Sequence, residues 1–189
     1  MTGELWLVRH GETEWSKSGQ HTGRTDIPLT SDGEAAATAM RVGLAEREFA
    51  QVLTSPLRRA SDTARLAGFA DAVVDDDLAE WDYGDYEGLT TPEIRAFVSG
   101  WTIWTHGCPG GETAEQVSER LDRVVARARA ADGDTLAFAH GHSLCALAAR
   151  WLDLPIRDGR LFRLETTTVS VLGEFHEAPV VKRWSSPLT

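Results

Sequence analysis

The sequence has little cysteine and no long apolar run, and both shortages narrow the class of protein. Cys108 and Cys145 are the two cysteines among 189 residues, and they form no CxxC spacing. Neither a disulfide framework nor a zinc knuckle is therefore expected. No stretch approaches the ~20 consecutive apolar residues of a membrane span, and no basic segment with an apolar core and cleavage site opens the chain. We expect a soluble protein of the reducing cytoplasm.

Positive charge is scarce as well. Lysine and arginine together number 19 against 29 aspartates and glutamates, which leaves a formal net charge of -10. Nucleic acid and anionic membrane surfaces would be repelled at long range, so neither is expected as a partner. An anion-binding site in this chain has to be a local cluster of Arg and His. Nothing in the sequence indicates the oligomeric state.

Short apolar runs alternate with stretches of helical periodicity along the chain. The runs lie at residues 5–8, 52–53, 73–74 and 135–139 and are rich in β-favouring side chains. Such alternation is typical of a sheet of parallel strands with helices on its faces. We therefore expect an α/β protein, a three-layer α/β/α fold with a mostly parallel central sheet, in one domain over residues 1–189.

Helix signals lie between these runs. Ser31 and Glu34 form a capping-box pair ahead of an Ala-rich stretch that reaches about residue 49. Ser55, as the cap, and Pro56, at the first helical position, are expected to open the next helix.

Two further helices and then a β-rich C-terminal region are predicted. Helical periodicity predicts helices over about 112–131 and 142–152. The segments 161–164, 168–175 and 180–184 are β-rich with short breaks, which predicts an added C-terminal strand or hairpin at the edge of the sheet.

Basic and polar residues follow three of the predicted strands. Arg9 and His10 come directly after the first strand, a helix bearing Arg58 and Arg59 follows the second, and "AHGH" at 139–142 ends the fourth. Ligands of an open α/β sheet bind beyond the carboxyl ends of its strands, so these side chains should converge. Arginine forks pair with phosphate oxygens, and the helix that begins after the last motif would add its positive end. The sequence therefore predicts a phosphate site.

Phosphoryl transfer to oxygen also needs a proton donor for the leaving group. "LAEWDYGDYEG" at 78–88 supplies four acids after the third predicted strand. A metal pair formed by His140 and His142 is the alternative, because alternate residues of an extended strand share a face. The arginines would repel a cation and the downstream carboxylates show no ligand spacing, so we expect no metal and no other cofactor.

These motifs together resemble a known family. "RHGETEWS" (9–16), "TG" (22–23), "SPLRRASDTA" (55–64), "EWDYGDYEG" (80–88) and "AHGH" (139–142) are similar, in order and spacing, to the histidine phosphatase superfamily in its phosphoglycerate-mutase-like branch. More narrowly, "WDYGDYEGL", "WTIWTHGCPGGET" and "FAHGHSL" resemble the subgroup that holds actinobacterial acid phosphatases and the fungal sedoheptulose-1,7-bisphosphatase.

The resemblance implies a role for each matching residue. His10 would be the nucleophile that takes the phosphoryl group on an imidazole nitrogen. Arg9, Arg59 and His140 would hold the phosphate oxygens. Glu80 would be the general acid, and then the base for the water that hydrolyses the phosphohistidine.

Two of these assignments rest on the family pattern and not on spacing. Helical spacing leaves Arg58 and Arg59 equivalent, because an aspartate three or four residues on can reach either. The family pattern selects Arg59, since the second arginine directly precedes an alanine. The same pattern places Glu80 at the acid position and makes Glu87 a supporting hydrogen-bonding residue.

A wider set of residues is expected to contact substrate. Besides Arg9 and Arg59, it comprises Ser16, Thr22, Gly23, Trp104, His106, Gly141 and His142. Ser16 stands where the family often has Asn, and the stretch around Trp104 and His106 contains Gly and Pro. Lys17 and Arg24 could meet a second anionic group of the substrate, although a solvated cation is the default for both.

The protein expected from the sequence is a phosphatase that hydrolyses phosphate monoesters of small metabolites through a phosphohistidine, in the manner of an acid phosphatase. A sugar-bisphosphate phosphatase is the alternative. A phosphoglycerate mutase is disfavoured, because such mutases typically carry a larger insertion where this chain has a short segment between Gly88 and Glu112. A catalytically silent phospholigand-binding module is disfavoured because nucleophile, acid and phosphate clamp are all present.

Overall fold

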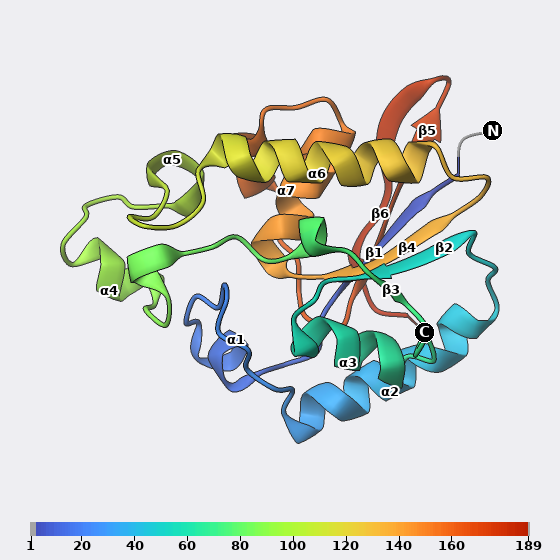
Figure 1. The fold of residues 1–189 in the computed structure, drawn as a ribbon, viewed down its shortest axis with the longest axis horizontal. Coiled ribbons are helices and arrows are strands. Elements are labelled where there is room, and N and C mark those ends of the chain that lie inside the picture. The colour runs from blue at the N-terminus through green and yellow to red at the C-terminus, as the bar shows by residue number, and fades with distance from the viewer. Residues whose placement is uncertain (1–2, 189) are drawn as a thin grey trace.

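Strands and helices alternate along the chain and assemble into a six-stranded sheet with helices on both faces (Figure 1). This computed structural model describes residues 3–188. The strands are β1 (Leu5–Arg9), β2 (Gln51–Thr54), β3 (Val73–Val74), β4 (Thr135–Ala139), β5 (Val169–Phe175) and β6 (Ala178–Ser186). The three-layer α/β/α architecture predicted from the sequence is confirmed.

The order of the strands in the sheet is β3-β2-β4-β1-β5-β6. β1 to β4 run parallel, and β5 and β6 form an antiparallel hairpin that joins the sheet at β1. His176 and Glu177 both have positive φ, as a tight hairpin turn requires. The predicted hairpin is therefore present, but residues 162–165 form no strand, and Leu161 ends a short 3-10 helix.

The two faces of β1 supply two separate cores. Leu5 and Leu7 pack in a cluster with side chains of α6 (Ala114–Arg129) and α7 (Gly141–Trp151), whereas Trp6 and Val8 pack with α2 (Ser31–Ala45) and α3 (Arg58–Leu66). Successive side chains of a strand point to opposite faces, and all four of these are apolar. A strand buried on both faces therefore reads as a continuous apolar run.

Neither predicted cap is observed, because α2 is capped one residue earlier and α3 has no side-chain cap. Thr30, not Ser31, caps α2, because its backbone is extended and its hydroxyl accepts the N–H of Gly33. Ser55 does not cap α3, which begins at Arg58 without a side-chain cap. The Ser55 hydroxyl is instead 2.7 Å from a histidine nitrogen of the site described below.

Shorter helices occupy the connections. They are α1 (Glu14–Ser18), α4 (Thr91–Arg95), α5 (Ile103–His106), and the 3-10 helices η1 (Asp76–Leu78), η2 (Gly84–Tyr86) and η3 (Ile156–Leu161). Within residues 3–188, no helix combines the length and apolar composition needed to cross a bilayer.

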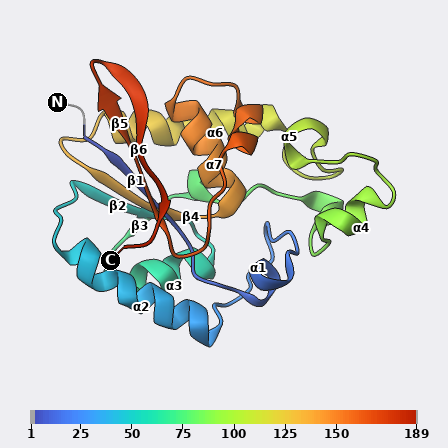
Figure 2. The same ribbon diagram turned by 180° about the vertical axis from the view of Figure 1, so that it is seen from behind.

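The carboxyl ends of three parallel strands meet at one end of the sheet. The N–H of His10 donates to the carbonyl of Ala139, and that of Ser55 donates to the carbonyl of Phe138. Figure 2, seen from behind, shows α1, α4 and α5 beyond this end of the sheet, as does Figure 1. The three strand ends therefore hold their next residues close together.

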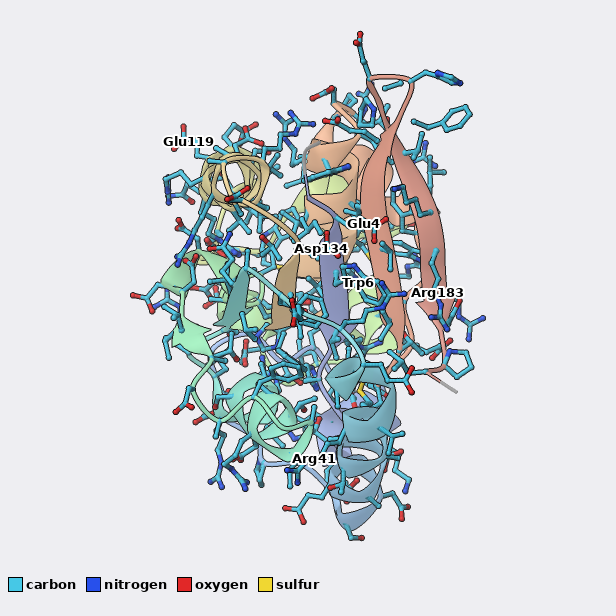
Figure 3. The ribbon with its side chains drawn as sticks, turned by 90° about the vertical axis from the view of Figure 1, so that its right-hand side faces the viewer. Glu4, Trp6, Arg41, Glu119, Asp134 and Arg183 are labelled. Atoms are coloured by element: carbon cyan, nitrogen blue, oxygen red, sulfur yellow. The ribbon has the colours of Figure 1, made fainter. Side chains whose placement is uncertain are left out.

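At the opposite end of the sheet, a hydrogen bond links the starts of two neighbouring strands. Figure 3 looks at this end, with Glu119 of α6 and Arg41 of α2 on opposite sides of the sheet. The Glu4 N–H donates to the Asp134 carboxylate at 2.8 Å between the starts of β1 and β4. Such a contact fixes strand register.

A test of the two-faced core is the substitution Leu7→Ala. Leu7 is fully buried at the middle of β1, and a cavity there should lower the free energy of unfolding by roughly 2–5 kcal/mol. Val42→Ala, on the exposed face of α2, should change it by less than about 0.5 kcal/mol. Urea unfolding of both variants checks this, and equal effects would contradict the packing.

Candidate active site

His10 follows β1 directly and lines a pocket of about 350 Å³ at the carboxyl ends of the strands. Its Nδ1 lies 2.7 Å from the carbonyl oxygen of Gly11. A carbonyl can only accept, so Nδ1 carries the proton and, in the neutral ring, Nε2 keeps its lone pair. Nε2 is therefore the nitrogen of this ring that could act as a nucleophile.

Burial and nearby positive charge keep His10 neutral. Desolvation first, and then the charges of Arg9 and Arg59, hold the pKa of His10 well below its usual value. His140 follows β4, and its ring centroid is 5.2 Å from that of His10. Burial lowers the pKa of His140 as well, with Arg59 the next contributor. Two neutral imidazoles thus stand side by side.

The hydrogen bonds of His140 fix its tautomer. Arg59 Nε donates to Nδ1 of His140 at 3.1 Å, which leaves the proton of the neutral ring on Nε2. That Nε2–H lies 2.7 Å from the Ser55 hydroxyl oxygen, to which it donates. Residues after β2 and β4 are therefore joined through one ring.

Arg59 is fully buried and holds the loop at residues 22–25. Its Nη2 donates to the carbonyls of Thr22 and Gly23, and its Nη1 donates to that of Thr25. With Nε bonded to His140, four of the five N–H groups are used. The structure thus makes Arg59 a clamp on the loop as well as a charge beside His10.

Glu87 holds the same loop from the other side. Its carboxylate accepts the N–H groups of Gly23 and Thr25 at 2.9–3.0 Å. A Cβ at Gly23 would lie 2.7 Å from both Glu87 Oε2 and the Trp81 carbonyl oxygen. Glycine is thus required at this close approach, and Glu87 has the supporting position expected for it.

Arg9 lies in the pocket wall and retains an unused donor. Its Nη1 donates to the carbonyl of Leu164 at 2.5 Å. Its Nε is buried and has no hydrogen-bond partner among residues 3–188. Buried donors are nearly always paired, so this one is an exception, and it lies close to Gly141, where a Cβ would be 3.4 Å away.

Glu80 lines the pocket from the loop after β3. Oε1 accepts the N–H of Trp81 at 2.9 Å and of Ser143 at 2.8 Å, and Oε2 accepts that of His142 at 3.0 Å. The positive end of α7, expected to face phosphate, is thus occupied by this carboxylate. The reason is that the 79–82 segment packs across the first turn of α7 and brings an acceptor to its free N–H groups.

A buried arginine of α6 supports the segment that carries Glu80. Arg120 is 7% exposed and donates to the carbonyls of Asp77, Ala79 and Glu80. The same guanidinium forms a two-pronged ion pair with Glu112 at 2.8–2.9 Å. The helix therefore anchors a stretch that has little regular structure of its own.

The predicted substrate contacts divide into two groups. The pocket is lined by Arg9, Ser16, Thr22, Trp104, Gly141 and His142, in addition to His10 and Glu80. Arg59, His140, Gly23 and His106 do not line it. Arg59 and His140 are fully buried next to it, while Gly23 and His106 border other hollows.

His106 and the two predicted loop cations are engaged elsewhere. His106 Nδ1 accepts the N–H of Thr102 within α5. Lys17 is 3.5 Å from Glu12, and Arg24 forms an ion pair with Asp82 on the side of a second hollow. The loop bends at Gly23, so Thr22 faces the pocket and Arg24 does not.

Several pocket residues were not predicted from the sequence. The polar ones with ionisable side chains include His21, Tyr83, Arg160 and Arg163. The Tyr83 hydroxyl lies 2.5 Å from His142 Nδ1, and the His21 ring is 4.8 Å from that of Tyr83. Spacing carries no signal for His21, whereas the two arginines lie three positions apart, Arg163 within the segment 161–164 predicted to be β-rich and Arg160 directly before it.

A metal site needs several suitable ligands close together. Among residues 3–188, no group of three or more His, Cys, Asp or Glu side chains is arranged to hold a metal ion.

Comparison with known sequences identifies the family. The family model of the histidine phosphatase superfamily (branch 1) matches residues 5–187. The chain is 45% identical over 176 residues to an acid phosphatase of Mycobacterium tuberculosis, covering 91% of this chain and 87% of that one. It is 39% identical over 192 residues to the sedoheptulose 1,7-bisphosphatase of Saccharomyces cerevisiae, covering 83% and 70%.

Solved structures agree. The structure of an open-reading-frame product of Mycobacterium tuberculosis superposes with a TM-score of 0.94 at 41% identity over 100% of both chains. A mycobacterial glucosyl-3-phosphoglycerate phosphatase in complex with VO3 gives a TM-score of 0.84 at 27% identity, covering 97% of this chain and 99% of that one. Because the family model and these relatives span most of its length, the protein belongs to the histidine phosphatase superfamily, branch 1.

Proposed function

We propose that the protein, a phosphatase of phosphate monoesters, hydrolyses them through a phosphohistidine on Nε2 of His10. The observation that carries this proposal is the pairing of two buried, neutral imidazoles 5.2 Å apart, of which His10 lines the pocket and keeps a free lone pair on Nε2. Nε2 would attack phosphorus as the bond to the ester oxygen breaks and its electron pair leaves with that oxygen. Water would then release phosphate from the ring.

Glu80 is the residue we propose as general acid and base. It would give a proton to the departing oxygen and take one from the attacking water. Three backbone N–H donors fix the direction of its carboxyl group. A positioned proton-transfer group is more effective than a mobile one, because little orientational freedom is lost during reaction.

Positive charge at the pocket would stabilise the phosphoryl group in flight. Arg9 lines the pocket, and the charge of Arg59 lies buried beside it with one N–H left beyond its four bonds. Catalysis of phosphoryl transfer depends mainly on such positioning and charge. His140 would act through its contact with the His10 ring and through Arg59.

Small phosphorylated metabolites are the substrates we propose, with acid-phosphatase-like activity as the first expectation. Similarity to the Mycobacterium tuberculosis acid phosphatase supports it. The yeast relative makes a sugar bisphosphate the second candidate. The cytoplasm is the compartment we propose, supported by two cysteines that both remain free thiols.

The roles of His10 and Glu80 can be tested with p-nitrophenyl phosphate. His10→Ala should lower kcat/KM by at least about 1000-fold, because the nucleophile is removed. Glu80→Gln should lower it by roughly 100-fold or more, because proton transfer is lost. Activity should persist in EDTA. His176→Asn, in the exposed hairpin turn, is the matched control, and a His10→Ala rate within tenfold of wild type would contradict the mechanism.

The intermediate itself is also measurable. Phosphorus-labelled substrate, quenched in base under which phosphohistidine persists, should leave label on the wild-type protein and none on His10→Ala. Glu80→Gln should hold more label at steady state if its loss slows attack by water more than it slows phosphorylation.

Two half-buried histidines of the pocket predict a loss of stability in mild acid. Burial lowers the pKa of His142 from 6.5 to about 4 and does the same for His21. The unfolded chain therefore binds more protons than the folded one between about pH 6.5 and pH 4, so stability falls as pH falls through this window. From pH 6.5 to pH 5 the contribution of His142 is on the order of 2 kcal/mol.

Urea unfolding at pH 6.5 and pH 5 measures this effect. The loss between the two pH values should be smaller in His142→Gln than in wild type, and it should be unchanged in His176→Asn. Identical losses in all three proteins would show that the pKa of His142 is not lowered by folding.

Glu87 provides a test of the loop that it shares with Arg59. Glu87→Ala removes the acceptor of two backbone N–H groups, which should loosen residues 22–25 and lower kcat/KM between about tenfold and a hundredfold. Glu87→Gln keeps one oxygen and should lose less. Asp85→Asn, an exposed acid two residues earlier, should match wild type in steady-state kinetics.

A further inference from the structure

One wall of the pocket is a segment with no part in the chemistry proposed above. Residues 160–164 comprise the last two residues of η3 and the three that follow it, and they contribute Arg160, Phe162, Arg163 and Leu164 to the lining. This segment, here called the arginine wall, lies in the sequence far from the strand ends that carry His10 and His140. The mechanism proposed above therefore does not explain why this segment lines the pocket.

The backbone of the arginine wall is tied firmly to its surroundings. The Leu164 carbonyl accepts from Nη1 of Arg9, which itself lines the pocket. The Phe162 carbonyl accepts from the Cys145 thiol at 3.3 Å, and the Arg163 carbonyl accepts from Trp184 Nε1 at 2.7 Å. The wall is therefore held at a defined place relative to the proposed phosphate site.

The two arginine side chains, in contrast, are held only by weak exposed pairs. Arg160 is 3.8 Å from Asp158, with side chains 55% and 23% exposed. Arg163 is 2.8 Å from Glu165, with side chains 91% and 57% exposed. Exposed ion pairs contribute about 0–1 kcal/mol, so either guanidinium can exchange its carboxylate for a ligand at little cost.

The charged residues that line the pocket are mostly positive, opposite in sign to the charge of the chain, although Arg160 and Arg163 are exposed. The net charge is -10, yet the lining includes three arginines, Arg9, Arg160 and Arg163, against the single carboxylate of Glu80. One guanidinium beside His10 suits the reacting phosphoryl group. The other two are in excess of what a substrate with one phosphate would use.

We propose that Arg160 and Arg163 bind a second anionic group of the substrate, while Arg9 and His10 take the phosphate that is cleaved. This inference rests on the proposed function and adds a substrate class, a doubly anionic metabolite such as a sugar bisphosphate or a phosphorylated acid. A pocket of about 350 Å³ has the volume of a small-metabolite site. Arginine forks recognise phosphate and carboxylate alike.

The choice of these arginines corrects the expectation for Lys17 and Arg24. Those two cations are paired outside the pocket, whereas the arginine wall faces it. Arg157, on η3, is exposed but does not line the pocket. It is a matched control, because it has the same charge and belongs to the same stretch of chain.

The kinetic test compares the Arg160→Gln/Arg163→Gln double variant with Arg157→Gln and wild type. The probes are fructose 1,6-bisphosphate, 3-phosphoglycerate, glucose 6-phosphate and p-nitrophenyl phosphate. Relative to p-nitrophenyl phosphate, kcat/KM for a doubly anionic probe should fall about tenfold or more in the double variant. The ratio should stay at its wild-type value in Arg157→Gln. Which of the first two probes loses more identifies phosphate or carboxylate as the second group.

A binding measurement separates this proposal from the catalytic one. In the His10→Ala background, fructose 1,6-bisphosphate should bind about tenfold more weakly when Arg160 and Arg163 are both glutamine. Added KCl should narrow the gap, because exposed charges are screened. Equal kinetic losses on all four probes, or unchanged affinity in this background, would overturn the proposal. Failure of wild type to hydrolyse p-nitrophenyl phosphate would instead count against the proposed function.

Discussion

A single buried guanidinium joins the parts of this site. Arg59 donates to Nδ1 of His140 and to carbonyls of the loop at 22–25, and it does so from a fully buried position. A buried charge is costly unless its donors are satisfied, and four of the five here have partners. The loop, the end of β4 and the start of α3 are therefore held in one arrangement.

Arg59 also affects the neighbouring rings of His10 and His140. By donating to Nδ1, Arg59 places the proton of His140 on Nε2, where Ser55 accepts it. Its charge also lowers the pKa of His10 and that of His140. Glu87 completes the arrangement by holding the loop that Arg59 clamps. Arg59 thus contributes to the His140 tautomer and the loop position, and, after burial, to the neutral state of both rings.

One side of the pocket has side chains held by hydrogen bonds, whereas the other side has exposed side chains. Around His10, Arg59 and Glu80, most polar atoms have partners within residues 3–188, and the buried side-chain exceptions there are Nε of Arg9 and Oγ of Ser143. Across the pocket, Arg160 and Arg163 sit on an anchored backbone but have exposed side chains. Such a division is suited to a constant reaction with variable substrates, because chemistry needs fixed geometry and recognition can use mobile charge.

The sequence alone determined those features that follow from patterns of neighbouring residues, namely the strands, the helices and the order of the motifs. The apolar run at residues 5–8, the motif "AHGH" and the alternation of strands and helices predicted the sheet, and with it the convergence of His10 and His140. The hydroxyl of Ser55 could not be assigned in this way: its spacing is that of a helix cap, and only the approach of β4 makes it a partner of His140. The same is true of the end of α7, which receives Glu80 from a distant loop. Periodicity and motif order are properties of neighbours in the chain, whereas hydrogen-bond partners, pKa shifts and the side of a loop that faces the pocket depend on segments brought together by folding, and only the tertiary structure decided them.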